Sequence, residues 1–316
     1  MSKLFETSEI NGMQLSNRFV RSATWEGLAA DDGACTPDFK EFYLQLARGG
    51  VGLIITSHTF VQPAGRGTPR QLGLHKDELI PGLQDLTGAV HQYGSCLAVE
   101  LSHAGILTNE KLTGRTPRAV SAVEQFNQDP VSELSHEDIQ EIIHAFALAA
   151  QRAQKAGCDA VQIHAAHGFL MNQFLSPAFN KRTDDYGGSV ENRARALLEV
   201  FRGMRSAVGS GYPILVKLNS DDVIEGGLNI EDAVQVGKML EEEGIDAIEI
   251  SGGTIITGDH CQKGIDTEDK EAYWRDAAKA FKPRILYPYH YGKTDTSRLV
   301  ELLQDQEDIE VRIRKF

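Results

Sequence analysis

The sequence predicts an α/β fold in which parallel strands alternate with helices and close into a (β/α)8 barrel. The first observation is a series of apolar runs of strand length, at Phe19–Ala23, Gly52–Ser57, Leu97–Ser102, Ala160–His164, Ile214–Leu218 and Ala247–Ser251. The second is a set of amphipathic stretches of helical length between these runs, at Asp38–Arg48, Leu79–Tyr93, Ile139–Ala156, Val190–Val208 and Ile230–Glu243. The third is a glycine that ends three of these stretches directly before the next run, at Gly94, Gly157 and Gly244.

Each kind of element supports the parallel arrangement. Continuous apolar runs indicate strands buried on both faces, which is typical of a parallel sheet covered by helices. Six clear units, with weaker seventh and eighth ones, favour a closed barrel over an open sheet. The chain has 316 residues, and one such barrel commonly uses about 250 residues or more. Without an internal repeat or a linker, we expect a single domain over residues 1–316.

Composition argues against some classes of partner and location. The chain has 45 acidic residues against 32 Lys and Arg, a formal net charge of −13 without a basic stripe, so we expect no nucleic-acid partner. No apolar run approaches the roughly 18 residues of a membrane span, and the N-terminus lacks a signal-peptide core. The four cysteines lie far apart. We therefore expect a cytoplasmic protein without a membrane contact, disulfides or a metal site.

The strongest indication of chemistry lies in the segment Ile163–Arg193. His164 and His167 stand at the end of an apolar run and precede a long polar loop. In a barrel, ligands bind at the C-terminal ends of the strands. Two imidazoles at that place can donate hydrogen bonds to one oxygen of a small-molecule substrate. From the spacing alone, helix-start histidines that bond to backbone carbonyls remain an alternative.

Polar residues also end the other runs. Ser22, Ala23, Thr24 and Trp25 follow the first run, where small residues let backbone groups approach a planar ligand. Glu100 is an acid inside an apolar run, and such groups are rarely buried without a partner. Lys217 is the candidate partner, so a plain ion pair is the alternative to a binding role. Ser251, Gly252 and Gly253 can present backbone N–H groups to a phosphate, or form only a turn.

These residues belong to an ordered series of motifs that resembles the old yellow enzyme family, which comprises FMN-dependent NADH:flavin oxidoreductases. The series consists of NRFVRSATWEG (Asn17–Gly27), VGLIIT (Val51–Thr56), AVELSHAG (Ala98–Gly105), the segment Ile163–Arg193, ILVKLNSDD (Ile214–Asp222) and IEISGG (Ile248–Gly253). It covers about residues 1–281 in the family's order. The resemblance implies bound FMN, NADH or NADPH as reductant, and hydride transfer to the activated C=C bond of an α,β-unsaturated carbonyl compound.

The resemblance also implies roles for single residues. His164 and His167 would anchor the substrate's carbonyl oxygen. Ser22–Trp25 would lie along the flavin ring, and His58 would contact it through its backbone. Glu100 stands where the family usually has Gln at the pyrimidine edge, and Lys217 matches the cation beside flavin N1 and O2. In the loop after the histidines, Arg182, Asp184, Asp185, Tyr186 and Arg193 are expected to form a salt-linked clamp.

The chain departs from the family pattern in two places. Phe169 stands where many relatives have a proton-donating Tyr, which leaves Tyr186, His103 or solvent as proton sources. The tail 282–316 lacks the family's glycine pair and arginine turn for the FMN phosphate. We expect a strand at Ile285–Tyr291, a helix at Ser297–Gln306 and a strand at Glu310–Phe316, from a shifted reading frame or an eroded tail. Three functions stay open: the flavoenzyme, a flavin-deficient inactive barrel, and a flavin-free lyase or isomerase. A homo-oligomer also stays open.

Overall fold

A curled sheet of seven parallel strands forms the centre of the molecule. The computed structural model describes residues 5–126, 130–256, 274–282, 285–286 and 310–311. The sheet has the strand order β11-β10-β9-β6-β4-β3, with β5 also paired to β6. Its strands are β3 (Val20–Arg21), β4 (Leu53–Ile55), β5 (Thr59–Phe60), β6 (Cys96–Ser102), β9 (Ala160–Ala165), β10 (Ile214–Asn219) and β11 (Ala247–Ser251). The six predicted strands are confirmed, although the first contains only two residues.

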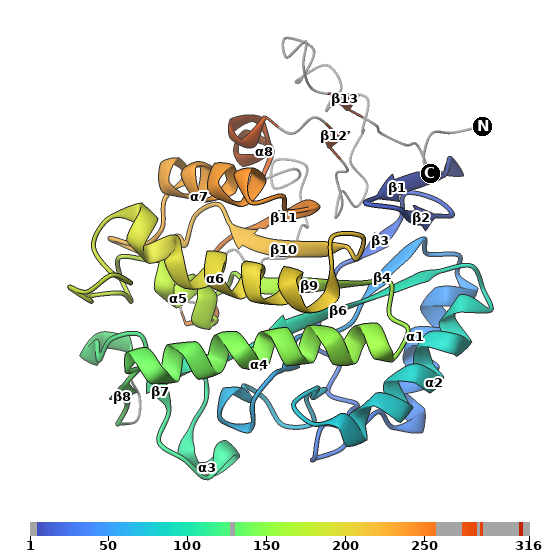
Figure 1. The fold of residues 1–316 in the computed structure, drawn as a ribbon, viewed down its shortest axis with the longest axis horizontal. Helices are drawn as coiled ribbons and strands as arrows, with labels where there is room; N and C mark the ends of the chain where they lie inside the picture. Colours follow the sequence, from blue (N-terminus) through green and yellow to red (C-terminus); the bar gives the residue numbers. More distant parts are fainter. Residues whose placement is uncertain (1–4, 127–129, 257–273, 283–284, 287–309, 312–316) are drawn as a thin grey trace, which may run out of the picture.

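Helices cover the outer face of this sheet (Figure 1). The long ones are α1 (Pro37–Arg48), α2 (Ile80–His91), α4 (His136–Lys155), α6 (Val190–Val208) and α7 (Ile230–Glu242). Four begin where a side chain accepts a hydrogen bond from the first turn, at Thr36, Ser135, Ser189 and Asn229. Large apolar side chains fill the layer between helices and strands, among them Phe39, Phe146 and Phe201. All five predicted helices are confirmed.

Shorter elements occupy the loops. They are α3 (Glu110–Thr113), α5 (Leu170–Leu175), α8 (Arg275–Phe281), the parallel pair β7 (Arg118–Ala119) and β8 (Ser132–Glu133), and 3-10 turns at Pro63–Gly65, Asp77–Leu79, Gly105–Leu107 and Glu124–Phe126. None of the described helices is both long enough and apolar enough to cross a bilayer.

An antiparallel hairpin closes the end of the sheet where the strands begin. Its strands are β1 (Ser8–Ile10) and β2 (Met13–Leu15). Met13 and Leu15 pack against Leu53, Ala98 and other residues of the inner face near the starts of the strands. Apolar side chains therefore fill this end of the inner face, and the C-terminal ends of the strands carry the polar residues.

In the tail beyond residue 282, the structure describes only two short strands. Strands β12 (Ile285–Leu286) and β13 (Glu310–Val311) pair with each other in parallel. Each falls inside a predicted strand and covers only two of its residues, while the predicted helix Ser297–Gln306 lies outside the described residues. Within the described part of the chain, β3 and β11 are therefore the two edges of a half barrel.

Candidate active site

A layer of polar side chains lies on the inner face of the sheet, above the apolar residues of the hairpin. The strand register places Glu100 beside Gln162, and Lys217 between His164 and Glu249. Alternate residues of a strand share a face, so these side chains stand together on the inner side. The apolar residues between them, such as Val161 and Val216, point outward into the core under the helices.

Lys217 is shared by two carboxylates. Its Nζ lies 2.8 Å from Glu100 Oε2 and 3.8 Å from Glu249 Oε1, and it donates a hydrogen bond of 3.5 Å to the carbonyl of Ala23. The side chains of Lys217 and Glu100 are 3% and 2% exposed. Glu249 also accepts hydrogen bonds from Ser22 Oγ (2.5 Å) and Gln162 Nε2 (2.8 Å). The predicted ion pair between Glu100 and Lys217 is confirmed, and Glu249 extends it.

Burial sets the protonation of this cluster. It raises the pKa of Glu100 to about 7, against the lowering effect of Lys217. Burial by itself lowers the pKa of Lys217, but the two carboxylates outweigh it and the net direction is upward. Lys217 is therefore a fixed cation, whereas Glu100 changes charge near neutral pH.

The two histidines stand at the end of β9, beside this cluster. Their ring centroids are 5.4 Å apart and the rings are perpendicular. His164 Nδ1 accepts a hydrogen bond from the Ala166 amide (3.3 Å), so its proton is on Nε2, which lies 3.8 Å from Glu100 Oε1. His167 Nε2 shares a hydrogen bond of 2.7 Å with Ser251 Oγ. These two ring contacts are with a backbone amide and a serine hydroxyl, whereas the alternative from the spacing required backbone carbonyls.

Both imidazoles are neutral at physiological pH. Burial lowers the pKa of His164 well below its usual range, and the nearby His167 and Lys217 add to the effect. Burial and the charge of Lys217 lower the pKa of His167 to about 3. A neutral ring donates a hydrogen bond without carrying a net charge, so the pair suits an uncharged oxygen that gains negative charge during a reaction.

Phe169 and His58 complete the aromatic wall of the site. Phe169 stacks on His164 with centroids 4.2 Å apart and an interplanar angle of 26°. The His58 ring meets Phe169 edge-on at 5.1 Å, and burial lowers the pKa of His58 to about 4. The backbone carbonyl of His58 accepts a hydrogen bond from Gln71 Nε2. A role of His58 beside a flavin stays a prediction.

One candidate proton source is excluded by its position. Tyr186 donates its hydroxyl hydrogen to Glu199 Oε2 at 2.8 Å and packs among the core residues under the helices. The interpretation of Tyr186 as a donor to the substrate is therefore wrong. His103 Nδ1 accepts from the Gly105 amide at 3.1 Å, and burial lowers its pKa to about 4. His103 is therefore a neutral ring that bonds to its own loop, and solvent is the other candidate proton source.

The residues after β3 lie partly open. Thr24 Oγ1 accepts a hydrogen bond of 2.6 Å from Arg21, and the Trp25 side chain is 48% exposed. The indole lies over Gly27, where an added Cβ would stand 3.2 Å from the ring. Trp25 is therefore not a core residue, and its place at a flavin edge stays a prediction.

The residues after β11 have competing contacts. The Gly253 amide donates to the Asp221 carbonyl at 2.8 Å. An added Cβ on Gly252 would stand 1.9 Å from the Trp274 ring, so this close packing requires glycine. Phosphate binding by Ser251, Gly252 and Gly253 stays a prediction, and it would have to replace the bond to Asp221.

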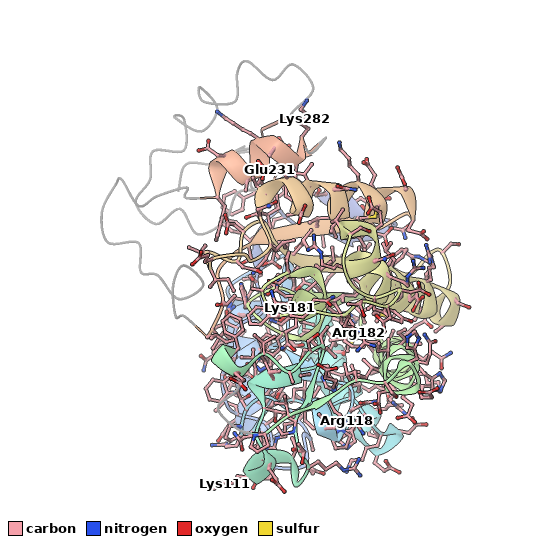
Figure 2. The ribbon with its side chains drawn as sticks, turned by 90° about the vertical axis from the view of Figure 1, so that its left-hand side faces the viewer. Lys111, Arg118, Lys181, Arg182, Glu231 and Lys282 are labelled. Atoms are coloured by element: carbon pink, nitrogen blue, oxygen red, sulfur yellow. The ribbon has the colours of Figure 1, made fainter. Side chains whose placement is uncertain are left out.

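Ion pairs fix the loop after the histidines, but of the expected clamp residues only Arg182 and Asp184 pair with each other. Arg182 pairs with Asp184 and donates a hydrogen bond of 2.7 Å to the Leu134 carbonyl. Arg193 pairs with Asp232 at 2.6 Å. Figure 2 shows Arg182 beside Lys181, on the side of the molecule that also carries Arg118. The clamp holds the segment Ile163–Arg193 from outside and leaves the histidines to the inner face.

The flavin ring fits the residues of the inner layer. Gln162 Oε1 is buried without a hydrogen-bond partner, and such an acceptor matches the N–H of a flavin pyrimidine edge. Lys217 is a buried cation of the kind that an anionic reduced ring would need beside it. The stretch of tail that was expected to lack the phosphate clamp lies mostly outside the described residues. Within the described part, no group of three His, Cys, Asp or Glu side chains could hold a metal ion.

Sequence reasoning missed Glu249 and Gln162. Each is a polar residue inside an apolar run, the same signal that singled out Glu100. The reasoning also passed over Asn172, Asn219 and Asp222, which only the folded chain brings together behind the histidines.

Comparison with known proteins agrees with the motif series. Residues 3–280 match the model of the NADH:flavin oxidoreductase / NADH oxidase family. An NADH oxidase of Thermoanaerobacter brockii is 40% identical over 253 residues, which are 79% of this chain and 39% of that protein. An NADPH dehydrogenase of Bacillus subtilis is 40% identical over 258 residues, which are 81% of this chain and 75% of that protein.

A solved structure extends the similarity to the fold. The old yellow enzyme homologue from Zymomonas mobilis superposes with a TM-score of 0.79 at 26% identity, over 98% of this chain and 88% of that one. The predicted (β/α)8 class is thereby confirmed. The family match ends at residue 280, next to the point where the motif series was expected to end.

Proposed function

Because the chain belongs to the NADH:flavin oxidoreductase / NADH oxidase family, an old yellow enzyme family, we propose that it reduces activated C=C bonds. FMN as cofactor and NADH or NADPH as reductant are confirmed at the level of the family. The chain spans only 39% of the Thermoanaerobacter relative, so the activity of the whole protein is part of the proposal. The proposed substrate is a small α,β-unsaturated carbonyl compound.

The observation that carries this proposal is the neutral histidine pair at the end of β9. His164 is the better-defined donor, because its Nδ1 is occupied by the Ala166 amide and its Nε2 carries the hydrogen. A carbonyl oxygen bound to both rings gains negative charge when hydride reaches the β-carbon. Hydrogen bonds already aimed at that oxygen are stronger in the transition state than in the ground state.

FMN, when bound, would supply the hydride that it receives from NADH or NADPH. The task of this chain's residues is to bind, orient and balance charge around it. Lys217 would stabilise negative charge on the reduced ring, and Gln162 Oε1 would accept a ring N–H. Glu100 would take or release a proton beside the lysine, since its pKa lies at about 7.

The proton for the α-carbon has no side-chain donor at Phe169. The phenyl ring stacks on His164 and cannot donate. Because the pKa values of both histidines are low, both rings are neutral near pH 7. Each ring can donate a hydrogen bond but has no extra proton to transfer. Solvent is therefore the proposed proton source, and it enters from the C-terminal ends of the strands.

The runner-up function is a flavin-deficient, inactive barrel. Its support is the tail 282–316, which departs from the family, together with the ion pair that already neutralises Lys217. The lyase or isomerase reading is weaker, because neutral histidines with pKa values well below 6.5 do not exchange protons readily near pH 7. We further propose a single domain over residues 1–316, a cytoplasmic location, and no nucleic-acid or membrane partner.

Purified protein separates the two main functions. The flavoenzyme should be yellow, or become yellow on adding FMN, and its flavin absorbance should bleach with NADH or NADPH under anaerobic conditions. A colourless, folded protein that does not take up FMN would reject the proposal in favour of the inactive barrel.

The histidine role needs its own variant. Replacing His164 and His167 together with Ala should abolish binding of cyclohex-2-enone and leave FMN bound. His91→Ala is the matched control, because His91 pairs with Asp159 at the opposite ends of the strands. Unchanged enone binding in the double variant would remove the anchor role.

A further inference from the structure

A buried polar network lies behind the histidine pair. Asp222, Asn172 and Asn219 are each fully buried. Asp222 Oδ1 accepts two hydrogen bonds, from Asn172 Nδ2 at 2.9 Å and from Asn219 Nδ2 at 2.8 Å. Its Oδ2 accepts from the Leu228 amide at 2.8 Å, and the Asp222 amide donates to the Leu228 carbonyl at 2.9 Å. The carboxylate is therefore held in place by its own loop.

The opposite end of each asparagine amide reaches the histidine segment. Asn219 Oδ1 accepts from the His167 amide at 3.2 Å, and Asn172 Oδ1 accepts from the Gly168 amide at 2.7 Å. His167 has a φ of 60° and Gly168 a φ of 85°. A histidine in the left-handed region is strained, so the surrounding contacts must hold it there.

The carboxylate sets the direction of both asparagines. A side-chain amide offers donors at one end and an acceptor at the other, and it can turn over when nothing fixes it. Because Asp222 Oδ1 accepts from both nitrogens, both amide oxygens must face the backbone N–H groups of His167 and Gly168. Without the carboxylate, Asn172 Nδ2 would lose its acceptor and Asn219 Nδ2 would keep only the Gly253 carbonyl, so the orientation of the two amides would be held by fewer contacts.

The network also joins the ends of three neighbouring strands. Asn219 ends β10, and its Nδ2 donates to the Gly253 carbonyl beyond β11 at 2.9 Å. The His167 carbonyl, beyond β9, accepts from the Ile255 amide at 3.1 Å. The ring of His167 reaches Ser251 of β11 at 2.7 Å. Backbone and ring of His167 are thus held from both sides.

We propose that Asp222 is a positioning residue that, through Asn172 and Asn219, holds His167 in the conformation that aims its ring at the substrate oxygen. Asp222 contacts neither the imidazole nor the reacting atoms. The inference rests on the proposed function only for the identity of the oxygen, because the backbone conformation of His167 can be measured without a substrate.

The test uses the full-length protein loaded with FMN and the variant Asp222→Ala. Amide exchange at His167 and Gly168, measured by NMR, should accelerate at least about tenfold because both amides lose a fixed acceptor. KM for cyclohex-2-enone should rise about tenfold, with kcat changed less and the FMN Kd within about twofold.

The matched control is Asp246→Ala. Asp246 is also a largely buried carboxylate that accepts a backbone N–H, from Ile214 at 2.7 Å, but it lies where β10 begins. It should leave amide exchange at His167 and KM near the wild-type values. If Asp222→Ala behaves like Asp246→Ala in both measurements, the positioning role is refuted.

Two further variants keep the test decisive if Asp222→Ala does not fold. Asp222→Asn retains the shape but offers only one oxygen, so either Leu228 or the asparagine pair loses its acceptor, and amide exchange at His167, Gly168 or Leu228 should accelerate. Asn219→Ala should raise KM, and combining it with Asp222→Asn should add little, because both act along one path. Fully additive effects would overturn the proposal.

Failure of the proposed function would look different. Wild-type protein that does not bind the enone would reject the proposed function, while amide exchange at His167 and Gly168 would still test the network.

Discussion

Replacing Glu100 with Gln should make the protein more stable at alkaline pH than the wild type. Glu100 is 2% exposed, and burial raises its pKa from 4.5 to about 7. An acid with a raised pKa in the folded state binds more protons there than in the unfolded state. Its contribution to the stability of the folded state therefore falls as the pH rises from its pKa in the unfolded state through its pKa in the folded state.

The size of the effect follows from that pKa. A rise from 4.5 to about 7 corresponds to about 3 kcal/mol in total, at roughly 1.4 kcal/mol per pKa unit. Between pH 5 and pH 8, the wild type should lose about 2 kcal/mol relative to Glu100→Gln. Gln is the neutral isostere, and Lys217 keeps a carboxylate partner in Glu249 at 3.8 Å.

The assay is urea denaturation of apoprotein, wild type and Glu100→Gln side by side, at intervals from pH 5 to pH 8. The free energy of unfolding of the wild type is subtracted from that of the variant at each pH. This difference removes the titration of all other groups, provided that both proteins have the same dependence of the free energy on urea concentration. A difference that stays constant with pH would refute the reasoning, because Glu100 would then be ionised throughout as the partner of Lys217.

Three further predictions concern the same site. Lys217→Met should weaken FMN binding at least about tenfold, measured by fluorescence titration, because it removes the buried cation and leaves Glu100 unpaired; unchanged affinity would contradict the role of Lys217. Phe169→Tyr places a hydroxyl on the ring that stacks on His164 at 4.2 Å and should accelerate flavin reoxidation by an enone at least about tenfold in stopped flow. An equal rate would show that proton delivery from solvent already suffices. Gly252→Ala should cost about 1–3 kcal/mol of stability by thermal unfolding, since its Cβ would stand 1.9 Å from the Trp274 ring, and a wild-type melting curve would show that this contact does not persist.

The strands were predictable because burial on both faces leaves a plain signal. The runs around Ala160–His164 and Ile214–Leu218 contain few polar residues, and both are strands within one residue of the expected ends. The first strand is shorter than its run, because it pairs only with β4 among the described strands.

Part of the site was predictable for a related reason. Glu100 stands out because an acid in an apolar run needs a partner, and Lys217 is that partner. The same signal marks Glu249, but a single sequence does not say that two acids meet one lysine across the sheet.

The rest depends on contacts between distant segments. Tyr186 sits close to the histidines in sequence, yet its hydroxyl bonds to Glu199 under the helices. Asn172 and Asp222 are 50 residues apart and meet only because β9 and β10 are neighbours. The spacing of residues along the sequence therefore indicates which side chains share the end of one strand. It does not indicate the hydrogen-bond network of Asn172, Asn219 and Asp222 behind the histidines.

The most direct test of the account is a stopped-flow experiment with enzyme reduced by NADPH under anaerobic conditions. Mixing with cyclohex-2-enone should reoxidise the flavin at a rate that saturates with enone concentration. In the variant with Ala at His164 and His167, saturation should disappear while the flavin stays bound. A wild-type enzyme that holds reduced flavin and is not reoxidised by the enone would contradict the account.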